Sequence, residues 1–203
     1  PESEYHYDEI SENMLYMPNN DYAERAADYL DTCIKNQDSS GGIVECHVTG
    51  MPAGIGETVF DKLDASLAKA VMSIGAVKGV EIGDGFDASK NNGSINNDAF
   101  TCQNGTVEKK TNHAGGILGG MSDGSEIILR AAFKPTPSIS REQHTINTGL
   151  EDTTIAITGR HDPVVVPRAV VVVESMVAIT ILDQMMVNMS AKMDSLESFY
   201  CKE

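Results

Sequence analysis

The segment from Pro167 to about Ser195 constrains the fold more than any other part of the chain. After Pro167 it holds more than twenty residues without Gly or Pro, far beyond an ordinary strand. The branched side chains of Val170 to Val173 favour a strand, yet the length decides for a helix. Glu174 and Asp183 interrupt its apolar run at positions that a bilayer centre would penalise. We therefore predict a buried helix of a soluble protein and no membrane span.

Composition sets the number of domains and the class of partner. With 203 residues, 41% of them hydrophobic, we predict one domain over residues 1–203, with an acidic, helical N-terminal segment over residues 1–38. Nucleic acids and anionic membranes require clustered Lys and Arg. The net charge of -15 therefore excludes both partners, whereas an anionic small molecule needs only a local cationic pocket.

The cysteines and histidines indicate neither a metal site nor a disulfide framework. The four cysteines are widely spaced, without a CxxC pair or a cluster at metal-ligand spacing, so we expect free thiols in a reducing cytoplasm and no metal. No secretory signal opens the sequence. His47, His113 and His144 have no obvious partner in the sequence, so we expect them to be structural or surface residues.

Alternating strand-like and helix-like segments predict an α+β fold. Asp21 with Glu24 has the form of a capping box before the first helix. The predicted helices cover residues 22–36, about 60–71 and 167–195. The predicted strands cover residues 43–48, 77–82, 125–133 and 150–157. We expect a long surface excursion without periodicity over residues 83–112 and a loop over residues 134–148.

The segment Gly120 to Gly124 satisfies the G-x-S-x-G pattern of a hydrolase nucleophile elbow, and Asp152 and His161 follow in the order such enzymes use. The context opposes this alternative. An elbow needs a strand before Ser122 and a helix after it, whereas glycines precede it and a strand-like segment follows. A plain turn is the better expectation.

Two further segments could bind an anion or a flat ring. The cluster Gly115 to Gly120 lets backbone amides approach a ligand closely, although a tight turn explains it as well. In the turn of Lys134, Pro135, Thr136, Pro137 and Ser138, one ammonium and two hydroxyls are held by stiff prolines, which suits a phosphate. From composition alone, a solvated polar loop is the better expectation for this turn.

The sequence Arg160, His161, Asp162 and Pro163 puts a guanidinium, an imidazole and a carboxylate on consecutive positions. A turn ending in Pro163 would spread these side chains in different directions. The alternative is an Arg-Asp pair that only ties down a loop.

Together these segments resemble the chorismate synthase family. The resemblance runs from about Asp38 to about Asp183. Five segments carry it: Gly56 to Ala65, Met72 to Gly83, Asn112 to Gly120, Lys134 to Ile139 and Gly159 to Pro163. Members of the family carry a further N-terminal half, and we expect this chain to lack it. The resemblance implies a layered β-α-β sandwich of helices against antiparallel sheets and a homotetramer.

The resemblance also implies the chemistry. The family eliminates phosphate and a ring hydrogen, in a 1,4-anti sense, from 5-enolpyruvylshikimate 3-phosphate to give chorismate, a step of the shikimate pathway to aromatic amino acids. It needs reduced FMN, with which NADPH is associated, although the reaction has no net redox change. The flavin lends an electron and recovers it, and cations stabilise the departing phosphate.

By resemblance, Arg160 and Asp162 are the catalytic candidates. Arg160 would contact the substrate phosphate and the flavin edge, and Asp162 would lie near the reactive flavin nitrogen and help to move the abstracted proton. The implied flavin-binding residues are Gly75, Ala76, Gly119, Lys134, Pro135, Thr136, Pro137, Ser138 and Arg160. At Gly75 the family commonly has Asn, so a side-chain amide is lost there.

The family's catalytic histidines lie in the half that we expect to be absent. We therefore expect the 203-residue chain alone to be inactive. The alternative is a non-catalytic flavin-binding or assembly module derived from that enzyme. Flavin titration and an activity assay on one sample would separate the two.

Overall fold

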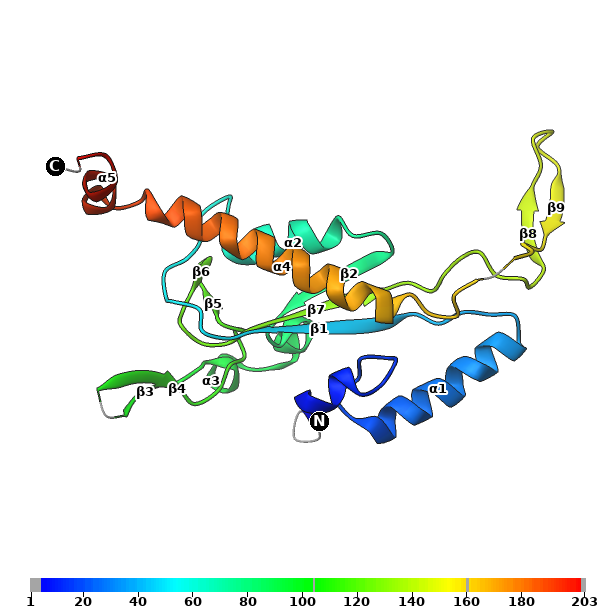
Figure 1. The fold of residues 1–203 in the computed structure, drawn as a ribbon, viewed down its shortest axis with the longest axis horizontal. Helices are drawn as coiled ribbons and strands as arrows, with labels where there is room; N and C mark the ends of the chain where they lie inside the picture. Colours follow the sequence, from blue (N-terminus) through cyan, green and yellow to red (C-terminus); the bar gives the residue numbers. More distant parts are fainter. Residues whose placement is uncertain (1–4, 104, 160, 202–203) are drawn as a thin grey trace. The chain divides into compact units, whose positions relative to one another are not determined.

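The computed structural model describes residues 5–103, 105–159 and 161–201 (Figure 1). Their contacts divide the chain into two compact units. The first unit comprises the described parts of residues 1–43 and 132–170, and the second unit those of residues 44–131 and 171–203. A single domain over the whole chain stays a prediction.

A three-stranded sheet forms the centre of the second unit, in the order β1-β7-β2. Its strands are β1 (Gly42–Val48), β7 (Ile127–Phe133) and β2 (Val77–Ile82). Along β7 buried and half-buried residues alternate, because successive side chains of a strand point to opposite faces. Ile127 and Leu129 are almost fully buried. One face of the sheet is therefore the core face.

The helix α2 (Leu63–Met72) packs against β2 and contacts β6 (Met121–Ser122). Leu63, Leu67 and Val71 recur every four residues on one helix face and are fully buried. They form the helical side of the core. The helix was predicted to begin near residue 60, three residues before its actual start at Leu63. The strands predicted over residues 43–48 and 77–82 are confirmed.

The predicted long helix is present as α4 (Val166–Met189), valine run included (Figure 1). Within the second unit it presents a narrow buried stripe of Val173, Val177, Ile181 and Gln184. Burial, together with the charge of Glu174 on α4, raises the pKa of the Cys46 thiol to about 11.

The prediction of a buried helix was wrong for the remaining faces of α4. Its exposed apolar residues include Val171, Val172, Ile179, Leu182, Met185, Met186, Val187 and Met189. An 18-residue stretch has a mean hydropathy of 1.9, enough to cross a membrane by length and composition alone, a property shared by core helices of soluble proteins. The helix ends at Met189, and a separate helix, α5 (Met193–Tyr200), follows.

The excursion expected over residues 83–112 is more ordered than predicted. It contains η3 (Gly85–Lys90), α3 (Gly93–Asn96) and an antiparallel hairpin of β3 (Phe100–Gln103) and β4 (Thr106–Lys109). A second hairpin, of β5 (Ile117–Leu118) and β6, follows. The dipeptide Asn104-Gly105 between β3 and β4 is a strong hairpin signal that outweighs the lack of periodicity.

The first unit carries η2 (Tyr7–Ser11) and α1 (Asn20–Lys35). The predicted helix is confirmed, but its cap is different. The Asn19 side chain accepts a hydrogen bond from Tyr22 N at 3.1 Å, so Asn19 caps the helix rather than Asp21. A side chain at the N-cap reaches the free amides of the first turn, which Asp21, already inside the helix, does not.

An antiparallel hairpin of β8 (Gln143–Ile146) and β9 (Asp152–Ile155) also belongs to the first unit. The strand predicted over residues 150–157 is thus present in shortened form, and the loop expected over residues 134–148 contains β8. Nearly all residues of this hairpin are exposed, so burial patterning gives no signal for it. Helices combined with antiparallel strands confirm the predicted α+β class.

Candidate functional site

Within the first unit, two of the predicted site segments are hydrogen-bonded to Ser39 and Ser40, which follow α1. Ser39 Oγ donates to the carbonyl of Thr136 at 2.7 Å, and Ser40 N donates to the carbonyl of Pro163 at 2.7 Å. A Cβ at Gly41 would lie 3.2 Å from Pro135 Cδ and only 2.4 Å from the carbonyl oxygen of Phe133. The chain after α1 thus holds both the proline-rich turn and the segment around Asp162.

An open cleft of about 290 Å³ lies between these segments. Its lining residues are Ile34, Gln37, Asp38, Ser39, Ile139, Ser140, Gly159, His161, Asp162 and Pro163. Among the predicted site residues that the structure describes, Asp162 is the one that lines the cleft. The turn from Lys134 to Ser138 continues into its wall at Ile139 and Ser140.

The Asp162 carboxylate has a cationic partner that the sequence analysis did not consider. Its Oδ2 lies 2.7 Å from Nη1 of Arg168, in the first turn of α4, and the two side chains are 37% and 73% exposed. Nε2 of His161 lies 3.1 Å from the carbonyl oxygen of Ile157 and donates to it, since a carbonyl only accepts. Arg160 lies outside the described residues.

The proline-rich turn presents its cation to solvent. Lys134 is exposed, whereas Thr136 and Ser138 are half-buried. The bond from Ser39 to the Thr136 carbonyl fixes the backbone between Pro135 and Pro137. A fixed backbone with an exposed ammonium suits an anion, and phosphate binding by this turn stays a prediction.

The predicted flavin-contact residues Gly75 and Ala76 of the second unit follow α2 directly. Ala76 has φ +73°, a left-handed conformation that is uncommon for a residue with a Cβ. A Cβ at Gly75 would meet no described atom within 4 Å. The departure from Asn at Gly75 thus leaves open space in front of the backbone.

The glycine cluster serves mostly for packing, with one exception. Gly115 and Gly116 are buried, and a Cβ at Gly115 would lie 2.3 Å from Gly83 N. Gly119 and Gly120 form the two-residue turn of the β5–β6 hairpin, with φ values of +60° and +89°. Gly119 alone among these four glycines is exposed, with no described atom near the place of a Cβ. It remains the candidate for a ligand contact.

The hydrolase alternative is wrong. Ser122 is 3% exposed, its Oγ donates to the Pro52 carbonyl at 2.6 Å, and the same oxygen accepts from Ile55 N at 3.0 Å. A hydroxyl committed in this way cannot act as an exposed nucleophile. The strand β6 ends at Ser122 itself, where an elbow would begin a helix.

Two histidines have carboxylate partners, as expected of structural residues. His47 lies 2.9 Å from Glu45 and 3.0 Å from Glu126. The hydrogen bond to Glu45, against the opposing effect of burial, raises the pKa of His47. His113 Nδ1 lies 2.7 Å from Asp84 Oδ2. His144 is exposed. These positions agree with the structural or surface role predicted for all three histidines, which stays a prediction.

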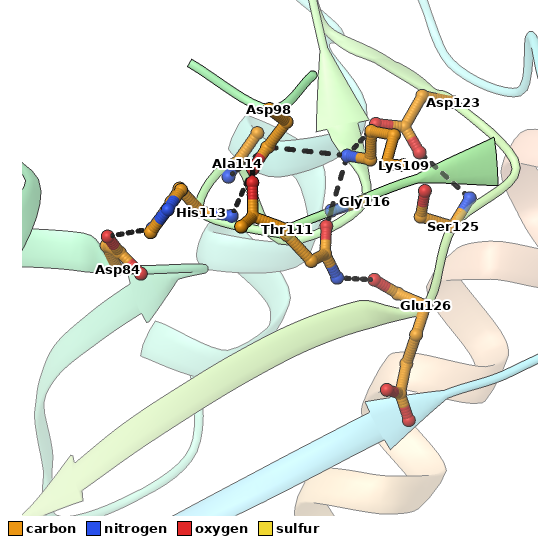
Figure 2. A network of polar contacts seen from close by, with 11 residues as sticks. Asp84, Asp98, Lys109, Thr111, His113, Ala114, Gly116, Asp123, Ser125 and Glu126 are labelled. Carbon is orange, nitrogen blue, oxygen red and sulfur yellow. Dashed lines mark hydrogen bonds and ion pairs between the residues drawn. The ribbon is translucent and has the colours of Figure 1, made fainter. Parts of the chain in front are cut away.

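A buried ionic cluster next to the glycine cluster was missed by the sequence analysis (Figure 2). Lys109 Nζ lies 2.7 Å from Asp123 Oδ2 and 3.5 Å from Asp98 Oδ2. Burial by itself would raise the pKa of Asp98, but hydrogen bonds from Ala114, Thr111 and His113, together with the Lys109 charge, lower it to about 2. These residues are scattered through an aperiodic stretch, so no spacing pattern indicates them.

Comparison with known proteins identifies the family. Residues 3–186 match the family model for chorismate synthase. The chorismate synthase of Agathobacter rectalis is 61% identical over 194 residues, which cover 96% of this chain and 53% of the relative. That of Archaeoglobus fulgidus is 57% identical over 150 residues, covering 73% of this chain and 42% of the relative.

A solved structure agrees with the sequence relatives. A crystal structure of chorismate synthase matches with a TM-score of 0.76 and 28% identity, over 96% of this chain and 52% of that chain. This match confirms the predicted fold, including its place within the family's layered architecture. The chain spans about half the length of the curated relatives it matches. It belongs to the chorismate synthase family.

Proposed function

We propose that this chain forms part of a cytoplasmic lyase that eliminates phosphate from 5-enolpyruvylshikimate 3-phosphate to give chorismate, with reduced FMN as cofactor. The observation that carries the proposal is the cleft of the first unit. There, Asp162 lines the same cleft as Ile139 and Ser140, which follow the Lys134 to Ser138 turn. Ser39 and Ser40 hold the two segments by donating to the carbonyls of Thr136 and Pro163. Family membership supports the same assignment.

The described residues fit a flavin phosphate and a flat ring. The Lys134 ammonium and the hydroxyls of Thr136 and Ser138 form a donor set suited to a phosphate. Open space lies in front of Gly75 and, separately, in front of Gly119, and each position suits a planar group that must approach a backbone closely. When bound, reduced FMN supplies an electron-rich ring that weakens the allylic carbon–oxygen bond of the substrate.

The chain's own groups then have separate roles. Asp162 is half-buried at the cleft and would accept or relay the proton removed from the substrate ring. Its pair with Arg168 orients the carboxylate. Arg160, from its place beside this turn in the sequence, would contribute positive charge to the departing phosphate.

The active form would be an oligomer, a tetramer as in the family, acting on a small anionic substrate without nucleic acid or membrane. Because the chain spans about half of its relatives, we infer that it does not form a complete site alone. The alternative is an assembly or flavin-binding module without turnover. The exposed apolar residues of α4, such as Ile179 and Leu182, favour this alternative.

An anaerobic assay with reduced FMN and the substrate tests both functions. The chain is assayed alone and after mixing with a separately produced N-terminal half of the A. rectalis relative. Chorismate formed only by the mixture supports the proposal. Flavin binding without turnover in the mixture supports the module. Chorismate formed at a normal rate by the chain alone would contradict the inference that its site is incomplete.

A further inference from the structure

The ionic cluster of Figure 2 lies at the base of the β5–β6 hairpin and is almost fully buried. The exposed fractions of the Lys109, Asp98 and Asp123 side chains are 4%, 3% and 8%. One ammonium between two carboxylates leaves a net negative charge, which is costly in a buried site unless hydrogen bonds compensate it. The cluster must therefore draw donors from the surrounding chain.

The donors come from the loop that leads into the hairpin. Asp98 accepts hydrogen bonds from Thr111 Oγ1 at 2.7 Å, His113 N at 2.8 Å and Ala114 N at 3.0 Å. Lys109 Nζ also donates to Asn112 Oδ1 at 3.1 Å. The same Asn112 oxygen accepts from Gly116 N at 2.9 Å. The charged side chains of Asp98 and Lys109 thus hold the backbone of the loop as far as Gly116, the residue directly before β5.

Asp123 connects the cluster to the other strand of the hairpin. Its Oδ2 accepts from Lys109, its Oδ1 accepts from Ser125 N at 2.8 Å, and its own amide donates to the Gly116 carbonyl at 3.0 Å. The backbone bond between Asp123 and Gly116 closes the base of the hairpin. Lys109 therefore contacts partners on both sides of that base, Asn112 before β5 and Asp123 after β6.

The hairpin needs such support because its strands have two residues each. A short two-stranded hairpin is not stable alone in water. Outside the cluster, Ser122 N donates to the Ile55 carbonyl at 2.9 Å, and Leu63 N donates to the Gly120 carbonyl at 2.8 Å. These bonds hold the β6 side. The β5 side, which leads to Gly119, is joined through Gly116 to the loop that Asp98 and Lys109 order, and the buried side chain of Ile117 adds to its support.

We propose that Lys109 is a positioning residue for the flavin ring: it fixes the base of the β5–β6 hairpin and thereby the exposed backbone of Gly119 at the tip. Lys109 itself touches neither cofactor nor substrate in this role. The flavin part of the inference rests on the proposed function, whereas the mechanical part concerns this chain alone.

Amide hydrogen exchange of the chain tests the mechanical part. Lys109→Gln removes the charge and keeps a donor. The matched control is Lys90→Gln, which makes the same change in an exposed ion pair with Asp87 on η3. We expect the amides of Gly116, Leu118 and Asp123 to exchange roughly a hundredfold faster in Lys109→Gln, with α2 little changed. Unchanged exchange in the hairpin would overturn the proposal.

A milder variant covers the case in which Lys109→Gln does not fold. Thr111→Val removes one hydrogen bond to Asp98 and leaves the three charges in place. The same hairpin amides should then exchange several-fold faster, on the scale of one lost charge-assisted bond. Exchange that rises equally in α2 and in the hairpin would mean a general loss of stability and would contradict the assigned role.

Flavin titration of the mixture with the N-terminal half tests the cofactor part. FMN affinity per folded molecule should fall about tenfold or more in Lys109→Gln and stay unchanged in Lys90→Gln. A wild-type mixture that binds no FMN overturns the proposed function and this part with it. A wild-type mixture that binds FMN, alongside a Lys109→Gln mixture of equal affinity, overturns the positioning role alone.

Discussion

Asp162 and Arg168 form an ion pair of 2.7 Å where the predicted catalytic turn meets the first turn of α4. The pair gives the carboxylate a fixed direction in the wall of the cleft. Exposed ion pairs contribute only about 0–1 kcal/mol to stability, and Arg168 is largely exposed. The pair therefore matters more for the orientation of the carboxylate than for folding. Measurements of turnover and of stability can thus tell a catalytic role of Asp162 from a role in holding the loop.

We expect Asp162→Asn to lower turnover of the mixed halves by roughly a hundredfold or more, because the amide cannot accept a proton. The melting temperature should change little. The comparison variant Arg168→Gln breaks the same ion pair but keeps the carboxylate, so turnover should fall clearly less than in Asp162→Asn. Equal losses of turnover in both variants, together with a large fall in melting temperature, would favour the loop-tying role.

Lys134→Ala should weaken FMN binding about tenfold or more in the mixture, since a charge-assisted hydrogen bond contributes roughly 1.5–3 kcal/mol. Lys134 is exposed, so the fold should persist. Lys78→Ala removes another exposed lysine and serves as the control. Fluorescence titration measures both affinities, and equal values for Lys134→Ala and wild type would exclude the phosphate assignment.

Much of the regular structure could be predicted because apolar residues recur with the period of a helix or a strand. The four-residue recurrence of Leu63, Leu67 and Val71 and the alternation along β7 result directly from burial on one face. The β8–β9 hairpin could not be found in this way, because almost all of its residues are exposed. For α4, the length of the segment without Gly or Pro correctly predicted the helix but not which of its faces are exposed.

The site was predictable only in part, for a different physical reason. Lys134 and Asp162 are candidates through short contiguous motifs that resemble the family, and their roles stay predictions. Three charged residues were missed: Arg168, Lys109 and Asp98. Their partners lie up to 16 positions away in the sequence, and the residues next to them in the sequence give no sign of these contacts. Long-range electrostatic contacts of this kind depend on the fold itself.

The bonds of His47 to Glu45 and Glu126 predict a pH-dependent stability. The hydrogen bond to Glu45 raises the pKa of His47 above 6.5 in the folded state. Its stabilising contribution is thus fully present below pH 6.5 and is lost as the pH rises through the folded value. His47→Gln should flatten this part of the pH dependence in urea unfolding, whereas His144→Gln, at an exposed site, should not.

Asp98 predicts a pH dependence of stability with the opposite sign, because folding lowers its pKa. Its pKa falls from 3.8 to about 2 on folding, so its contribution is present above pH 3.8 and is lost as the pH falls toward 2. Asp98→Asn should lower the free energy of unfolding at neutral pH by on the order of 2 kcal/mol. The difference from wild type should shrink in acid. Asp87→Asn, at an exposed carboxylate, is the control and should be nearly neutral at neutral pH.

The exposed face of α4 predicts self-association of the isolated chain. Ile179, Leu182 and Met186 lie three and four residues apart on one helix face and are each more than half exposed. Contiguous apolar surface of this kind is normally covered by another protein surface. Sedimentation velocity should therefore show concentration-dependent oligomers of the chain alone.

The double variant Ile179→Glu/Met186→Glu places two charges on that face and should shift the chain toward the monomer. Leu150→Glu makes the same kind of change at a residue that is 83% exposed in the β8–β9 connection and should leave the oligomers unchanged. If the same α4 variant also fails to combine with the N-terminal half, one apolar face serves both associations. A monomeric wild-type chain at all concentrations would mean that this surface does not drive association.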